Sequence, residues 1–209
     1  LEMPAMKPFS TFALCFVMFV ISAEWPGMAQ EDGERAHVTV KNPASLSASQ
    51  ANRIYDELKE RLSERYAMSK LEITSGYQSW PRYNSTPYLS STHGQRFINS
   101  YANALGKDYG KIKGNARYPV GTGFAKDSIT VRSEGKIFPG ALFVMEKLKA
   151  GANSETADWR YVMEIPDGSI FGDTIGDEPE LVKYCHACHE AKASADYVFY
   201  VPRKYRIQP

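Results

Sequence analysis

The sequence predicts a single α+β domain built on an antiparallel β-sheet, with one leading helix and a C-terminal segment that carries a Cys-x-x-Cys-His motif. Its 209 residues suffice for one domain with a core. Only residues 47–67 have a long helical period, and the chain after them consists of short β-prone runs separated by Gly, Pro, Asn and Ser. Tight-turn sequences at 133–136 and 166–169 join consecutive runs, and such turns pair strands antiparallel.

Residues 1–29 are expected to form a cleavable signal peptide. Lys7 precedes an uncharged, mostly apolar run at 8–23, and the small residues Gly27 and Ala29 suit a signal peptidase cutting after Ala29. The run is shorter than the about 20 apolar residues of a membrane span, so an uncleaved anchor is the alternative. We therefore predict a periplasmic protein, with a flexible lead at 30–45 and the folded domain at 46–209.

The leading helix is predicted from its cap and its period. Ser47 and Gln50 form a capping box, and apolar residues recur at helical spacing up to about residue 67: Ala51, Ile54, Tyr55, Leu58 and Leu62. Strands are predicted at 71–75, 95–100, 122–125 with 128–132, 141–148, 159–165 and 197–201. A short helix is predicted at 101–109, and helical turns are predicted on either side of the motif within 178–195.

The motif Cys185-His186-Ala187-Cys188-His189 has the spacing by which haem c is attached. Two thiols add to the porphyrin vinyl groups, and the next histidine, here His189, supplies an axial ligand to iron. His186 is expected to be a solvent-exposed spacer. Zinc binding with His37 and His93, or a redox-active cysteine pair, are the alternatives. Cys15 falls within the predicted signal, so both other cysteines are available for haem.

The composition and charge of the chain limit the classes of partner that are expected. The formal net charge is +1 and no basic stripe is present, so nucleic acid is not expected as a partner. Thirteen Tyr and ten Phe suit a β-rich core and the apolar walls that a porphyrin needs.

The second axial position of the iron is predicted to be open to a small ligand or substrate. No methionine follows His189, which disfavours a small His/Met electron carrier. Met145 and Met163 lie on predicted strands, where core packing is the simpler role, and His93 lies in a Ser/Thr-rich loop typical of the surface. A plain electron-transfer protein would need one of these three as a sixth ligand.

Several segments together resemble the cytochrome P-460 family. They are Tyr-Pro-Val-Gly-Thr-Gly-Phe-Ala-Lys-Asp at 118–127, Leu-Phe-Val-Met-Glu at 142–146, the strand opening at Trp159, and the Cys-x-x-Cys-His motif followed by Tyr-Val-Phe-Tyr at 197–200. Gly-Tyr-Gln-Ser-Trp at 76–80 and Arg96 resemble it more weakly. The resemblance covers roughly 76–206, outside the leading helix. The interval between Glu146 and Trp159 is shorter than in hydroxylamine-oxidising members.

The resemblance implies a monohaem c-type protein with an antiparallel sheet, an open iron face and a homodimeric state. In the enzymes of the family a strand lysine is linked to a meso carbon of the porphyrin, and hydroxylamine is oxidised to nitrous oxide. Relatives of the beta-type cytochrome c prime group lack the link and bind nitric oxide or carbon monoxide.

Carried over residue by residue, Lys126 matches the linking lysine and Glu146 matches a carboxylate near the substrate, which can act as general base. Arg96 could pair with a haem propionate. The alternative for all three is an ordinary position at the solvent surface. Candidate pocket walls are Tyr118, Phe124, Phe143 and Trp159.

Two functions follow from the resemblance. The first is hydroxylamine oxidation with electrons passed to a soluble cytochrome c. The second is gas binding without catalysis.

Overall fold

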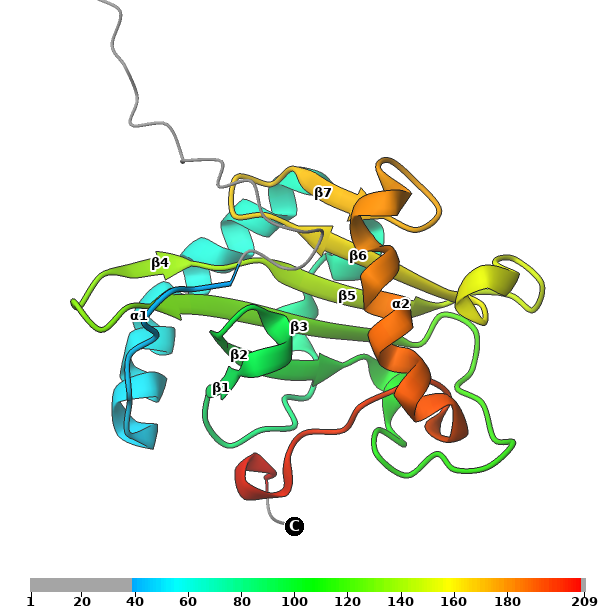
Figure 1. The fold of residues 1–209 in the computed structure, drawn as a ribbon, viewed down its shortest axis with the longest axis horizontal. Coiled ribbons are helices and arrows are strands. Elements are labelled where there is room, and N and C mark those ends of the chain that lie inside the picture. Colours follow the sequence, from blue (N-terminus) through cyan, green and yellow to red (C-terminus); the bar gives the residue numbers. More distant parts are fainter. Residues whose placement is uncertain (1–38, 208–209) are drawn as a thin grey trace, which may run out of the picture. The chain divides into compact units, whose positions relative to one another are not determined.

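The computed structural model describes residues 39–207. The predicted signal peptide at 1–29, and residues 30–38 of the predicted lead, lie outside the described residues. The described chain forms a seven-stranded antiparallel sheet of order β1-β2-β3-β5-β6-β7, in which β4 also pairs with β3 (Figure 1). The predicted α+β fold class is therefore confirmed. Within residues 39–207, no helix has both the length and the apolar character needed to cross a bilayer.

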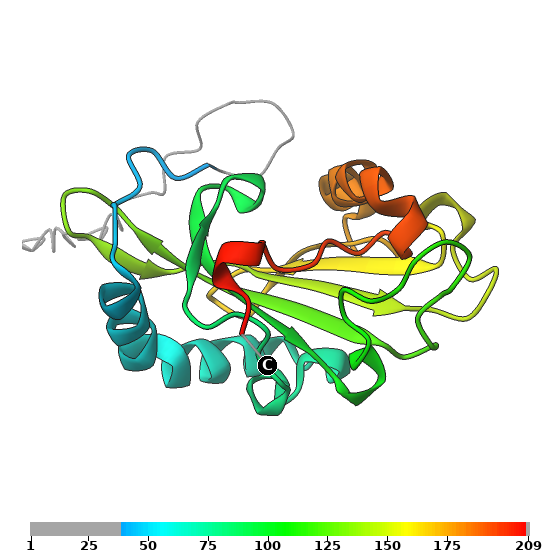
Figure 2. The same cartoon turned by 90° about the horizontal axis from the view of Figure 1, so that it is seen from below.

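The leading helix α1 spans Ala48–Tyr66, close to its predicted bounds. Both halves of the capping box at Ser47 and Gln50 are present, and they satisfy backbone groups at the first turn. The buried face of α1 consists of Ala51, Tyr55, Leu62 and Tyr66. It packs against one face of the sheet (Figure 2). The packing buries the apolar face that the helical period predicts.

The strands are β1 (Tyr88–Ser90), β2 (Arg96–Ala102), β3 (Gly123–Val131), β4 (Ile137–Pro139), β5 (Leu142–Lys147), β6 (Trp159–Glu164) and β7 (Ile170–Asp173). The predicted strands at 95–100, 141–148 and 159–165 correspond to β2, β5 and β6. The two runs at 122–125 and 128–132 form the single strand β3. The predicted turns at 133–136 and 166–169 join β3 to β4 and β6 to β7, with Gly135 and Gly168 at φ 82° and 84°.

Three local predictions are wrong. Residues 71–75 contain the 3₁₀ turn Glu72–Thr74, closed by local hydrogen bonds. Residues 197–201 form no strand, because positive φ angles at Asp196 and Tyr197 turn this segment across the face of the sheet (Figure 2). In the predicted helix at 101–109, β2 continues to Ala102 and only Ala104–Gly106 is a 3₁₀ turn.

The other face of the sheet carries α2 (Lys183–His189) and the C-terminal segment (Figures 1 and 2). The motif itself forms α2, between the 3₁₀ turns Pro179–Val182 and Glu190–Ala195. Further 3₁₀ turns span Ala67–Ser69, Tyr77–Ser79, Ser91–His93, Ser154–Thr156 and Arg203–Tyr205. The described part of the predicted lead is hydrogen-bonded to the domain, through Val40 N to Gly94 O (2.9 Å) and Ala44 N to Val131 O (2.8 Å).

Candidate cofactor site

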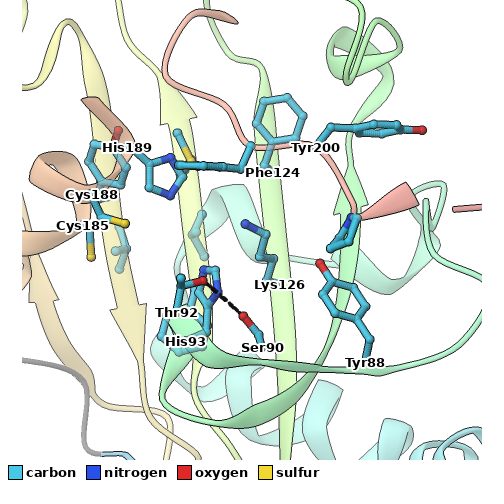
Figure 3. A pocket seen from close by; sticks show the side chains of 17 residues that line it. Tyr88, Ser90, Thr92, His93, Phe124, Lys126, Cys185, Cys188, His189 and Tyr200 are labelled. Carbon is cyan, nitrogen blue, oxygen red and sulfur yellow. Dashed lines mark hydrogen bonds between the residues drawn. The ribbon is translucent and has the colours of Figure 1, made fainter. Parts of the chain in front are cut away.

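A pocket of about 960 Å³, including its open mouth, lies on the α2 face of the sheet (Figure 3). Strands β3, β5 and β6 form its floor, and α2, the C-terminal segment and the stretch from β1 to the turn Ser91–His93 form its walls. Its lining is mainly apolar and aromatic, and includes Phe124, Phe143, Met145, Tyr161 and Phe199.

Helix α2 presents the three residues of the motif to this pocket. Cys185, Cys188 and His189 all line it, because residues three and four apart share one face of a helix (Figure 3). Val182, just before α2, is fully buried and fixes the start of the helix against the sheet. Burial raises the pKa of the Cys185 thiol to about 12, so this sulfur is protonated at neutral pH.

The imidazole of His189 is held in one tautomer. Its Nδ1 lies 2.6 Å from the carbonyl oxygen of Tyr197, and a carbonyl oxygen can only accept, so Nδ1 carries the proton. Nε2 then has the lone pair that a metal needs. Burial, with the nearby charge of Lys126, lowers the pKa of His189 to about 3, which keeps the ring neutral.

The prediction for His186 is wrong, because this residue is buried. Its ring stacks on Tyr197 with centroids 5.1 Å apart, and its Nδ1 lies 3.4 Å from the Tyr161 hydroxyl. The segment after α2 folds back over this ring. His186 thus packs α2 against β6 and the C-terminal segment.

Lys126 extends from β3 into the pocket (Figure 3). Phe124, two residues earlier, lines the same pocket, as the alternation of a strand requires. The amine lies deep in the protein, yet solvent still reaches the side chain through the mouth of the pocket. Burial lowers its pKa to about 8. The structure therefore brings Lys126 together with both cysteines and His189.

Glu146 does not line the pocket. It alternates along β5 with Met145, which does, so its carboxylate leaves the opposite side of the strand. There it lies 3.1 Å from Nη1 of Arg160, whose Nη2 is 2.6 Å from Asp173. Sequence alternation between Met145 and Glu146 could have indicated this separation. The arrangement gives Glu146 a partner in a charge network on the other face of the sheet.

Arg96 is buried, unlike an ordinary surface arginine. Its Nη1 donates to the carbonyl oxygen of His93 at 3.2 Å, whereas its Nε is buried and has no hydrogen-bond partner among the described residues. Such an unpaired buried donor is costly and suits an acceptor that the protein itself does not provide.

His93 lines the pocket, although sequence reasoning expected a surface loop. Its Nδ1 lies 2.8 Å from the Ser90 hydroxyl, and its ring packs edge-on against Phe143. Met145 also lines the pocket, whereas the sulfur of Met163 receives a contact from the Tyr184 hydroxyl at 3.6 Å. No pattern in the neighbouring residues predicts that His93 lines the pocket, because its position depends on the pairing of β1 with β2, which brings the loop over the sheet.

The predicted walls are divided between the pocket and the core behind it. Phe124 and Phe143 line the pocket, and Tyr118 and Trp159 pack behind Phe124 with centroids 5.1 and 6.0 Å from its ring. Tyr88, Ser90, Thr92 and Tyr161 line the pocket without having been predicted. As for the zinc alternative, residues 39–207 contain no cluster of three or more His, Cys, Asp or Glu side chains placed to hold a metal ion.

A comparison with known protein families identifies the family of this chain. The family model for cytochrome P-460 matches residues 74–200. The chain belongs to the cytochrome P-460 family. A comparison with curated protein sequences found no match. As a member of the cytochrome P-460 family, the chain is a cytochrome whose cofactor is haem c.

The residues of the pocket fit haem c as this cytochrome P-460 cofactor. Two cysteines and a histidine with an available Nε2 share one helix face, and aromatic side chains form the walls. Arg96 is not among the residues that line the pocket, but its unpaired Nε has the chemistry to donate to a propionate, which accepts hydrogen bonds from a guanidinium. These donors and walls come from segments far apart in the sequence.

Proposed function

We propose that this cytochrome oxidises hydroxylamine, or a related small nitrogen compound, at one haem attached through Cys185 and Cys188. In this proposal Nε2 of His189 would bind the iron and Arg96 would pair with a propionate. The amine of Lys126 would replace the hydrogen of a porphyrin meso carbon, and the two electrons and two protons lost would reduce a peroxide to water. The proposal includes a periplasmic location, a homodimer and a soluble cytochrome c as electron acceptor. These three points rest on the sequence and on the resemblance.

The position of Lys126 is the observation that supports the proposal most. Its amine shares one pocket with both thiols and with His189, and burial lowers its pKa to about 8. At pH 7 about a tenth of the amine is therefore uncharged and nucleophilic, far more than for a lysine with its ordinary pKa. A lysine at the solvent surface would have neither property.

Haem, when bound, supplies an iron centre that can bind the nitrogen of a small molecule and accept its electrons. Two hydroxylamine molecules give one nitrous oxide and one water, with release of four electrons and four protons. The aromatic walls would leave a small molecule mainly apolar surroundings on the sheet side of the pocket. The Tyr197 carbonyl holds the neutral ring of His189 in one orientation, which would leave Nε2 available to bind the iron.

The test uses protein matured in a periplasm and purified with its cofactor. We expect hydroxylamine-dependent reduction of a soluble cytochrome c, a ferrous Soret band displaced to the red, and a tryptic peptide containing Lys126 joined to the haem peptide. Lys126→Met should abolish the linked peptide and the red displacement while haem stays attached through the cysteines.

Lys149→Met, at an exposed lysine, is the matched control and should leave all three observations unchanged. Absence of hydroxylamine oxidation in the unmodified protein would contradict the proposed activity. Absence of covalently bound haem would contradict the proposed site itself.

A second candidate function is reversible binding of nitric oxide or carbon monoxide at haem without the lysine link. The observation that favours it is the lining of the pocket, which contains no carboxylate among the described residues. Tight gas binding with an ordinary five-coordinate haem c spectrum, and no hydroxylamine oxidation, would favour this function over the first.

A further inference from the structure

His93 occupies a different side of the pocket from the motif. In Figure 3 the His189 ring and the His93 ring lie apart, with the cysteines to one side of the space between them and the Lys126 amine to the other. All five side chains line the same pocket. A planar group attached at the cysteines and held by His189 would present its second face toward His93.

Several contacts fix His93 in this position. Nδ1 lies 2.8 Å from the Ser90 hydroxyl and 3.2 Å from the Thr92 hydroxyl, and its backbone carbonyl accepts from Arg96 Nη1 at 3.2 Å. The ring also packs edge-on against Phe143, with centroids 5.0 Å apart. The loop is closed by β1–β2 pairing, and Gly94 adopts a left-handed φ of 69°. The imidazole is therefore placed before any ligand arrives.

Four other polar side chains of the lining, those of Ser90, Thr92, Tyr161 and Lys126, have different partners or roles. Ser90 and Thr92 bind the His93 ring itself, and the Tyr161 hydroxyl lies against His186 on the motif helix. Lys126 is assigned to the porphyrin edge under the proposed function. Glu146, the residue that the sequence suggested for contact with substrate, lies on the other face of the sheet.

We propose that His93, oriented by Ser90, hydrogen-bonds through Nε2 to the small molecule bound opposite His189. The inference rests on the proposed function only in requiring haem with an open axial position, and it holds equally for hydroxylamine and for a diatomic gas. Imidazole can donate to or accept from such a molecule, so this residue would set its orientation and affinity.

The test compares ligand complexes of the haem-loaded protein with those of His93→Phe. In the ferrous carbon monoxide complex, a polar group near the ligand oxygen lowers the C–O stretching frequency, so the frequency should rise in His93→Phe. The dissociation constant of cyanide for the ferric protein should increase about tenfold, the effect of one lost hydrogen bond. His93→Gln, which keeps an amide donor, should restore part of both effects.

Ser91→Ala is the matched control, because Ser91 lies in the same turn as His93, is exposed and is not among the residues that line the pocket. It should leave the frequency and the cyanide affinity unchanged. Covalent haem content, measured in every variant, verifies that the site is intact. His93→Gln keeps the test valid if His93→Phe fails to fold.

Unchanged frequency and affinity in His93→Phe would overturn the inference. So would a six-coordinate, low-spin ferric spectrum that becomes five-coordinate in His93→Phe, because His93 would then be an iron ligand. A protein that shows the frequency shift but no hydroxylamine oxidation would retain the inference and contradict the proposed catalytic function.

Discussion

Nδ1 of His189 lies 2.6 Å from the carbonyl oxygen of Tyr197, so a backbone group eight residues further along the chain selects the nitrogen that can face a metal. Tyr197 and its neighbour Asp196 both have positive φ angles, 65° and 50°. The carboxylate of Asp196 is fully buried and accepts from Lys147 Nζ at 3.0 Å and from the Tyr118 amide at 2.9 Å. The turn that orients His189 is thus anchored to β5.

Asp196→Asn should destabilise the domain. The substitution leaves the buried Lys147 amine without its charged partner, and breaking a buried ion pair from one side costs about 3 kcal/mol. Chemical denaturation at pH 7 measures the change. Asp108→Asn, in an exposed pair 3.8 Å from Lys111, is the control and should change stability by less than about 0.5 kcal/mol. Equal effects of the two substitutions would contradict the anchoring role.

Glu146→Gln should leave hydroxylamine oxidation and cyanide affinity within about twofold of the unmodified protein. Its carboxylate faces Arg160 and not the pocket, whereas loss of a general base typically lowers the rate by about 10²–10⁴-fold. Initial rates and equilibrium titration provide the measurements, with Glu155→Gln at an exposed position as background. A hundredfold loss of activity in Glu146→Gln, but not in Glu155→Gln, would show that Glu146 takes part in the reaction.

Tyr55→Phe should lower the free energy of unfolding by about 2 kcal/mol at pH 7.5. The Tyr55 hydroxyl donates to the buried carboxylate of Asp127 at 2.6 Å, beside a second bond from Tyr77 at 2.9 Å. Burial raises the pKa of Asp127 to about 6, so at pH 7.5 the lost hydrogen bond is one to a charged group. Tyr205→Phe in the C-terminal segment should have little effect, and a similar loss there would contradict the explanation.

Glu164→Gln should stabilise the domain, relative to the unmodified protein, more at pH 8 than at pH 5. Glu164 is fully buried, neither carboxylate oxygen has a hydrogen-bond partner among the described residues, and burial raises its pKa from 4.5 to about 8. Between these values the unfolded chain loses a proton that the folded state keeps, so stability falls as the pH rises through this window. A glutamine at this position does not titrate. The advantage in free energy of unfolding of Glu164→Gln over the unmodified protein should therefore grow by about 3 kcal/mol between pH 5 and pH 8.

Denaturation at several pH values tests this last expectation. Glu60→Gln, at an exposed position of α1, is the control and should give a difference from the unmodified protein that does not vary with pH. If the advantage of Glu164→Gln is the same at pH 5 and pH 8, the pKa of Glu164 is not raised in the folded state.

Much of the sheet could be predicted because its strands have local signals. The period of α1, the capping box at Ser47, and the β-prone runs of β2, β3, β5 and β6 are contained in neighbouring residues. The short strands β1, β4 and β7 were missed, since three or four residues give too little pattern and these strands form by pairing with longer ones. Residues 197–201 were predicted as a strand because their residue types are β-prone. In the structure these residues cover the face of the sheet and do not pair with it.

The sequence by itself determined the fold class, the leading helix and the motif at Cys185–His189, because each depends on residues close together in the chain. Only the tertiary structure decided which side chains share the pocket. Strand pairing and alternation direct Lys126 into it and Glu146 away from it, and the β1–β2 loop brings in His93. Such placement depends on register between distant segments, which neither residue spacing nor composition records.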